Sequence, residues 1–154
     1  MKTLGLDIAT TTGWAIAEAA EGKRTLFHCG EWALGKTDGR GLLTFDKKLE
    51  LQLAQGVTRV ACEDVLFIRS RAQGHSYGAL RGMVLKTCYD WGVPVLWVPV
   101  QRVKRHATGS GAADKADMVA AASKRFGPSV AGDAELTDNM ADALWVLDYA
   151  LQNP

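Results

Sequence analysis

The chain has 154 residues, of which 47% are hydrophobic and 23% are charged, and its formal net charge is +1. This size and balance predict a single domain over residues 1–154, able to bury a full core, and argue against a second independent domain. So weak a net charge does not by itself indicate a nucleic-acid-binding protein. No apolar run approaches the roughly 20 residues that are needed to cross a bilayer.

The first part of the chain predicts an antiparallel meander of three strands, at residues 3–8, 13–18 and 25–34, with a turn at residues 21–23. Apolar residues at intervals of three and four then predict a helix that Gly39 opens and that ends near Gly56. A short apolar strand at residues 58–63 comes next. Because a helix joins this strand to the sheet, it is expected to lie parallel to the first strand and beside it.

The second half of the chain predicts mainly helices. Residues 69–76 are expected to be irregular, and a helix at residues 77–91 follows, with one face on the sheet and the other on a twin helix of a second copy. The remaining predicted elements are a strand at residues 95–99, a short helix at residues 99–107, and two helices capped by Asp114 and Thr137. The fold class is therefore α/β, with a five-stranded mixed sheet (three antiparallel strands, then parallel strands) flanked by helices.

Three cysteines, Cys29, Cys62 and Cys88, share no metal-type spacing. Their odd number, with no secretory leader in the sequence, predicts free buried thiols in a reducing cytoplasm.

Several carboxylates occupy positions where a charge is costly unless it has a chemical role. Asp7 ends the first strand and Glu63 ends its predicted neighbour, so both should lie at one sheet edge. Asp138 and Asp142 are four residues apart and share a face of the last helix, with Asn139 also in reach of Asp142. These carboxylates would repel one another unless they bound protons or divalent cations, and oxygen ligands suit Mg²⁺, with Mn²⁺ as a substitute.

The pattern favours hydrolysis of phosphodiester bonds, in which two ions about 4 Å apart hold the attacking and the leaving oxygen. Lys115, at the start of a helix, is the best-placed cation to stabilise the transition state. Taken alone, three of the acids have a simpler interpretation: Asp7 as a turn residue, Glu63 as a solvated strand end, and Asp138 as a charge at a helix start. Asp142, between two alanines on an otherwise apolar helix face, is harder to explain in this way. Only the joint pattern favours a metal site.

Basic residues flank the acidic segments, which predicts a positive surface for DNA despite the weak net charge. The basic residues expected to bind DNA are Arg69, Arg71, Arg81, Lys104, Arg105 and Lys115.

Ordered motifs span nearly the whole chain: Gly5-Leu-Asp7, Glu63-Asp-Val-Leu-Phe67, Ala79-Leu-Arg-Gly82, Val98 to Lys104, Thr108 to Lys115 and Asp138 to Leu144. Together they resemble the RuvC-type Holliday junction resolvases of the RNase H-like (integrase) superfamily, in a phage- or prophage-like variant. The resemblance implies a homodimer that nicks symmetric strands of a four-way DNA junction, in recombination, repair or phage DNA processing. Branch-migration proteins are possible partners that it does not require.

The resemblance also assigns roles to residues. It implies two ions per site, held by Asp7, Glu63, Asp138 and Asp142, with Asn139 as the alternative to Asp138. It implies that Lys104 and Lys115 contact phosphate and that Phe67 stacks near the junction centre. For Phe67, a place in the core is an equal alternative.

Three other functions are compatible with parts of the pattern. An RNase H-like nuclease could act on other branched DNA or on RNA with the same metals. A non-catalytic junction-binding module would keep the basic residues but would gain nothing from Asp138 and Asp142. An actin-like kinase shares the Asp7 strand and turn, but it needs a second such domain, so it ranks low.

Overall fold

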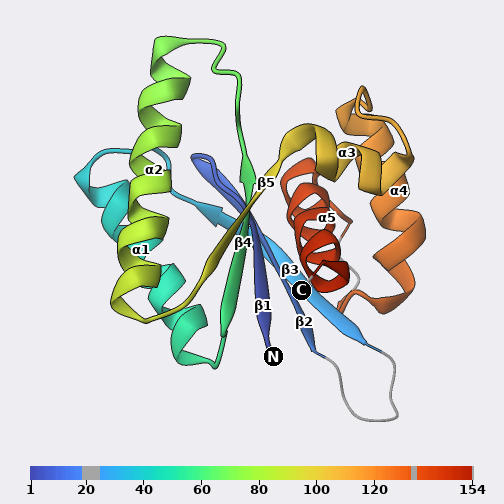
Figure 1. The fold of residues 1–154 in the computed structure, drawn as a ribbon, viewed down its shortest axis with the longest axis horizontal. Helices are drawn as coiled ribbons and strands as arrows, with labels where there is room; N and C mark the ends of the chain where they lie inside the picture. Colours follow the sequence, from blue (N-terminus) through green and yellow to red (C-terminus); the bar gives the residue numbers. More distant parts are fainter. Residues whose placement is uncertain (19–24, 133–134, 154) are drawn as a thin grey trace.

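The computed structural model describes residues 1–18, 25–132 and 135–153, with a mixed five-stranded sheet at its centre (Figure 1). The sheet order is β3-β2-β1-β4-β5. Strand β2 pairs antiparallel with β1 and with β3, and strand β4 pairs parallel with β1 and with β5. This confirms the predicted fold class, while the predicted turn at residues 21–23 lies outside the described residues. The strands are β1 (Thr3–Asp7), β2 (Thr11–Glu18), β3 (Leu26–Ala33), β4 (Arg59–Asp64) and β5 (Val95–Pro99).

Helices cover both faces of the sheet (Figure 1). One face carries α1 (Gly39–Ala54) and α2 (Arg71–Asp90). The other carries α3 (Val100–Thr108), α4 (Lys115–Phe126), the short η1 (Gly127–Ser129) and α5 (Asp138–Gln152). Among the described residues, no helix is both long and apolar enough to cross a membrane.

The structure differs from prediction at the start of α2, which begins at Arg71 instead of Tyr77. The expectation that residues 69–76 are irregular is therefore wrong for most of that segment. The side chain of Ser70 caps the helix by accepting a hydrogen bond of 3.1 Å from the backbone N–H of Gln73. The early turns of α2 are mostly exposed, so they lack the apolar spacing on which the prediction depended.

Glycines let α5 lie directly on the backbone of the sheet. A Cβ added to Gly5 of β1 would come within 2.5 Å of the Ala143 carbonyl oxygen, and one on Gly13 of β2 would overlap the backbone of Asn139. Any larger residue would push the helix away from the sheet. The two glycines therefore fix where the N-terminal half of α5 sits.

Side chains of β1 and β4 alternate between the two cores. Leu6 and Cys62, which pair in register, face the core under α1 and α2, whereas Ala61 belongs to the core under α5. Because side chains alternate along a strand, Asp7 and Glu63 also come out on the α5 side. The sheet thus delivers two carboxylates, next to each other, to the helix that carries Asp142.

Candidate active site

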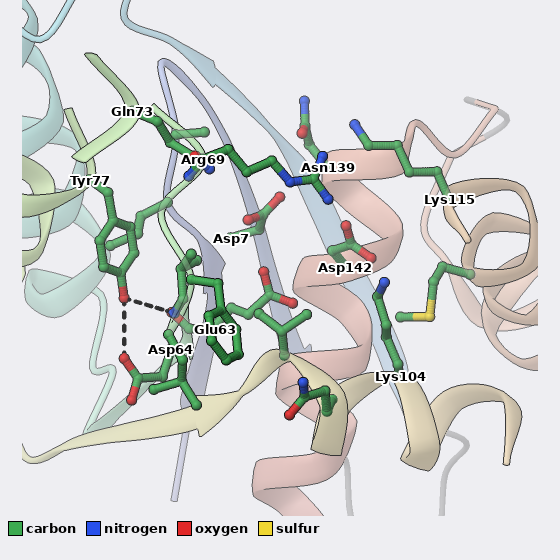
Figure 2. Close-up of a pocket in the computed structure, with 18 of the residues that line it drawn as sticks. Asp7, Glu63, Asp64, Arg69, Gln73, Tyr77, Lys104, Lys115, Asn139 and Asp142 are labelled. Carbon is green, nitrogen blue, oxygen red and sulfur yellow. Dashed lines mark hydrogen bonds between the residues drawn. The ribbon is translucent and has the colours of Figure 1, made fainter. Parts of the chain in front are cut away.

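An open cleft of about 1010 Å³ lies at the ends of β1 and β4, between α2 on one side and α3, α4 and α5 on the other. Asp7, Glu63 and Asp142 converge in it from three different elements (Figure 2). All three side chains are partly buried. The sequence prediction that residues far apart in the chain meet at one sheet edge is therefore confirmed as geometry.

The electrostatics of the cleft disfavour charge on these acids. Burial raises the pKa of Asp7 well above its ordinary value, and the nearby carboxylates of Glu63 and Asp142 raise it further. Burial, and then Asp142, raise the pKa of Glu63 to about 7, while Lys104 opposes the shift. The pKa of Asp142 rises to about 6, first through burial and then through Asp138. Protons or cations in the cleft would relieve this repulsion.

The side chains of Asp138 and Asn139 make different contacts, although both residues belong to the first turn of α5. Asp138 accepts a hydrogen bond of 2.7 Å from Nζ of Lys115, and this contact lowers the pKa of its carboxyl. Asn139 lines the cleft, and its Nδ2 donates a hydrogen bond of 3.0 Å to Oε1 of Glu31. Of the two, only Asn139 is among the residues that line the cleft.

The donor chemistry of the cleft fits a hard divalent cation. Carboxylate oxygens, with an amide oxygen at the rim, are ligands that Mg²⁺ and Mn²⁺ accept, and a cation would offset the charge that the raised pKa values oppose. As arranged within residues 1–18, 25–132 and 135–153, no group of three or more His, Cys, Asp or Glu side chains is positioned to hold a metal ion. The metal ligands therefore stay a prediction.

Some of the residues predicted to bind DNA are also in the cleft. Phe67 is 77% exposed, so its alternative assignment to the core is wrong. Arg71, the first residue of α2, and Arg105 of α3 are exposed and lie outside the cleft lining. The predicted DNA-binding residues that line the cleft are Phe67, Arg69, Lys104 and Lys115.

Arg81, also predicted to bind DNA, is not among the residues that line the cleft, and it forms a network that was not predicted from the sequence. Its Nη1 donates to Oδ1 of Asp64 at 2.7 Å and to the hydroxyl of Tyr77 at 3.1 Å, and its guanidinium lies 3.8 Å from the ring centre of Trp97. The Tyr77 hydroxyl also accepts from the backbone N–H of Val65 at 3.1 Å (Figure 2). The network holds the end of β4, where Glu63 lies. The four-residue spacing of Tyr77 and Arg81 was the one available signal for it.

A mixed sheet that presents carboxylates to a covering helix is the arrangement of an RNase H-like nuclease.

No protein-family model matches the chain. Relatives named crossover junction endodeoxyribonuclease RuvC do match it. The protein from Roseiflexus sp. (strain RS-1) is 30% identical over 122 residues, 76% of this chain and 72% of the relative. The protein from Nitratidesulfovibrio vulgaris (strain DP4) is 30% identical over 118 residues, 75% of this chain and 71% of the relative. The chain therefore belongs to the RuvC family of crossover junction endodeoxyribonucleases, as predicted.

Solved structures agree on the fold. The T. thermophilus RuvC in complex with its Holliday junction substrate is similar with a TM-score of 0.77 and 20% identity, covering 99% of this chain and 96% of that one. The yeast mitochondrial Holliday junction resolvase Ydc2 is similar with a TM-score of 0.65 and 13% identity, covering 94% of this chain and 75% of that one.

Proposed function

We propose that this chain is a metal-dependent endonuclease that resolves four-way DNA junctions by paired, symmetric hydrolysis of phosphodiester bonds, in recombination and repair. The observation that carries the proposal is the convergence of Asp7, Glu63 and Asp142 in one open cleft, with raised pKa values. Membership of the RuvC family supports the substrate, since a relative with the same fold has been solved with a Holliday junction.

The cofactor we propose is Mg²⁺, with Mn²⁺ as a substitute, at two ions per site. Bound ions would offset the negative charge that builds up around phosphorus during hydrolysis. The carboxylates are the ligands, because their own charges are unfavourable until a cation is near. The proposed ligand set is Asp7, Glu63 and Asp142, with either Asp138 or Asn139.

The cations and the aromatic residue of the cleft are proposed to hold DNA. Lys104 of α3 and Lys115 of α4 lie on the α5 side of the cleft, where they can attract a phosphate. Phe67 and Arg69 line the other side, ahead of α2, and Phe67 presents a bare ring to an unpaired base. Arg71, Arg81 and Arg105 would contribute at most from outside the cleft.

We propose a homodimer formed through the outer face of α2. Gly78 and Gly82 lie on this face, and a Cβ on either would meet no atom within 4 Å. Leu85 and Tyr89 continue the same stripe and are 48% and 87% exposed. A glycine inside a helix costs about 1 kcal/mol relative to alanine, and no close contact among the described residues requires a glycine at either position. Helix α2 of a second copy, packed closely against the first, would explain both the two glycines and the exposed apolar side chains.

We propose that residues 1–154 act as one nuclease domain in the cytoplasm, since a reducing compartment suits the free thiols of Cys29, Cys62 and Cys88. Branch-migration proteins are possible partners that the proposal does not require.

The test is cleavage of a four-way DNA junction by the wild type and by Asp142→Asn. The variant is expected to lose nicking in Mg²⁺ and to bind the junction at least as tightly, because a repulsive charge has gone. Strand mapping on gels measures the first and a mobility shift the second, with Glu135→Gln, an exposed acid before α5, as the control. Flap, linear duplex and RNA–DNA hybrid substrates complete the panel. Persistent nicking by Asp142→Asn, or preferred cleavage of another substrate, would contradict the proposal.

A further inference from the structure

Glu31, on strand β3, receives two hydrogen bonds from the start of α5. Its Oε1 accepts from the hydroxyl of Thr137 at 2.5 Å and from Nδ2 of Asn139 at 3.0 Å. The Thr137 hydroxyl oxygen also accepts from the backbone N–H of Met140 at 3.2 Å, as the cap of α5. Its single hydrogen is therefore directed to Glu31, and Glu31 acts in both contacts as an acceptor.

This contact fixes which way the Asn139 amide faces. An ionised carboxylate can only accept hydrogen bonds, so the nitrogen of the amide must face Glu31. The carbonyl oxygen is then the polar atom that Asn139 can offer to the cleft it lines (Figure 2). The backbone of Asn139 is held as well, because it packs against Gly13 with no room for a Cβ between them.

Asp138 is less suited to complete the site. Its carboxylate is paired with Lys115 at 2.7 Å. A further carboxylate in the cleft would also add to the repulsion among Asp7, Glu63 and Asp142, whereas an amide oxygen adds a hard donor without a charge.

We propose that Glu31 is a positioning residue, which orients the Asn139 amide so that its oxygen joins Asp7, Glu63 and Asp142 as the fourth donor toward a divalent ion. The inference rests on the proposed function, because it assumes that the cleft binds a metal. It goes further in assigning a role to an edge-strand residue outside the cleft lining and in choosing Asn139 over Asp138.

The test is the affinity of the full chain for Mn²⁺, measured without DNA from the electron paramagnetic resonance signal of free Mn²⁺. Glu31→Ala is expected to weaken binding about tenfold, as is typical when a group that orients a ligand is removed. Asn139→Ala should weaken it similarly, and the double variant should be no worse than either single one, since both remove the same donor. Glu135→Ala, which deletes a nearby exposed negative charge, should leave the affinity unchanged.

A charge swap keeps the test decisive if Glu31→Ala folds poorly. Asn139→Asp alone would place a second carboxylate against that of Glu31. Adding Glu31→Gln restores the hydrogen bond between the two side chains, with the glutamine amide now donating to the aspartate. The pair is expected to bind Mn²⁺ several-fold more tightly than Asn139→Asp alone, with thermal unfolding recorded for every variant.

Unchanged affinity in Glu31→Ala, absence of rescue by the swap, or loss of affinity in Asp138→Asn with none in Asn139→Ala would each overturn the inference. In all three outcomes a wild type that binds Mn²⁺ and cuts junctions leaves the proposed function standing. A wild type that neither binds Mn²⁺ nor cuts would remove both.

Discussion

Asp7, Glu63 and Asp142 sit where ionisation is unfavourable, because each is partly buried beside the others. Such a site lowers the stability of the protein without a metal ion, and binding of a cation there would raise that stability. The same carboxylates that would bind the ion therefore have an effect that can be measured without DNA or activity.

Glu63 is expected to make the metal-free protein less stable as the pH rises. Its pKa is about 7 in the folded chain against an ordinary 4.5, so the folded state keeps a proton that the unfolded state has released. Stability therefore falls between these two values and stays low above the higher one. Glu63→Gln should remove the part of this fall that Glu63 causes and raise the free energy of unfolding by roughly 2 kcal/mol at about pH 8, with little effect below about pH 4.

Urea unfolding in a chelator, across that pH range, measures the effect. Glu135→Gln serves as a control, because that side chain is exposed. If the free energy of unfolding changed with pH in the same way for the wild type and Glu63→Gln, burial of this carboxyl would have no effect on stability.

Lys115 is expected to matter for catalysis far more than for stability. Its side chain is 81% exposed, so its pair with Asp138 should contribute less than about 1 kcal/mol. Lys115→Ala should slow single-turnover cleavage by about tenfold or more, since a cation beside the phosphate stabilises the transition state. Junction affinity, measured by fluorescence anisotropy, should change much less. Equal losses of rate and affinity would show that Lys115 helps to bind DNA but does not stabilise the transition state.

Among the elements, α3, α4 and α5 are joined by one buried carboxylate. Asp148 of α5 is 5% exposed. Oδ2 lies 2.8 Å from Nε2 of His106 on α3 and 2.9 Å from Nε2 of Gln152, and Oδ1 accepts from Nη2 of Arg125 on α4 at 3.3 Å. These helices carry Lys104, Lys115 and Asp142, so the contact holds the basic side of the cleft against its acidic side.

Removing the Asp148 charge should therefore be costly. Asp148→Asn is expected to lower the free energy of unfolding by about 1–3 kcal/mol, because donors on three side chains lose a buried carboxylate acceptor. Asp90→Asn breaks a surface pair with Lys86 at 3.0 Å and should leave the free energy of unfolding nearly unchanged. Denaturant titration of both variants gives the comparison. Similar small losses would mean that the three helices are held by apolar packing alone.

The elements also differ in how far the sequence could predict them. Strand order and the meeting of Asp7 with Glu63 followed from alternation and from the helical crossover between β1 and β4, which are local rules. The early part of α2 was missed because its side chains face solvent and leave no apolar pattern. Glu31 could not be predicted, since its partners lie more than a hundred residues away and only the packing of α5 on Gly13 brings them together.

For the whole molecule, the cleft opens beside the N-terminal end of α2, while the stripe of Gly78, Gly82, Leu85 and Tyr89 runs along the same helix. A dimer built on that stripe would place two clefts around a two-fold axis. Two symmetric clefts are what paired nicking of a four-way junction requires. The oligomeric state therefore bears directly on the outcome of cleavage.

Gly82→Leu is expected to disrupt this dimer, because the new side chain would occupy the space into which the twin helix packs. Sedimentation equilibrium should show a dimer dissociation constant raised about tenfold or more, and junctions should be nicked on one strand at a time. The monomer should be no less stable, since leucine favours the helix over glycine by up to about 1 kcal/mol. Gly39→Leu adds the same group to open space at the start of α1 and should leave the dimer intact. A wild type that sediments as a monomer at micromolar concentration, or Gly82→Leu that dimerises normally, would rule out α2 as the interface.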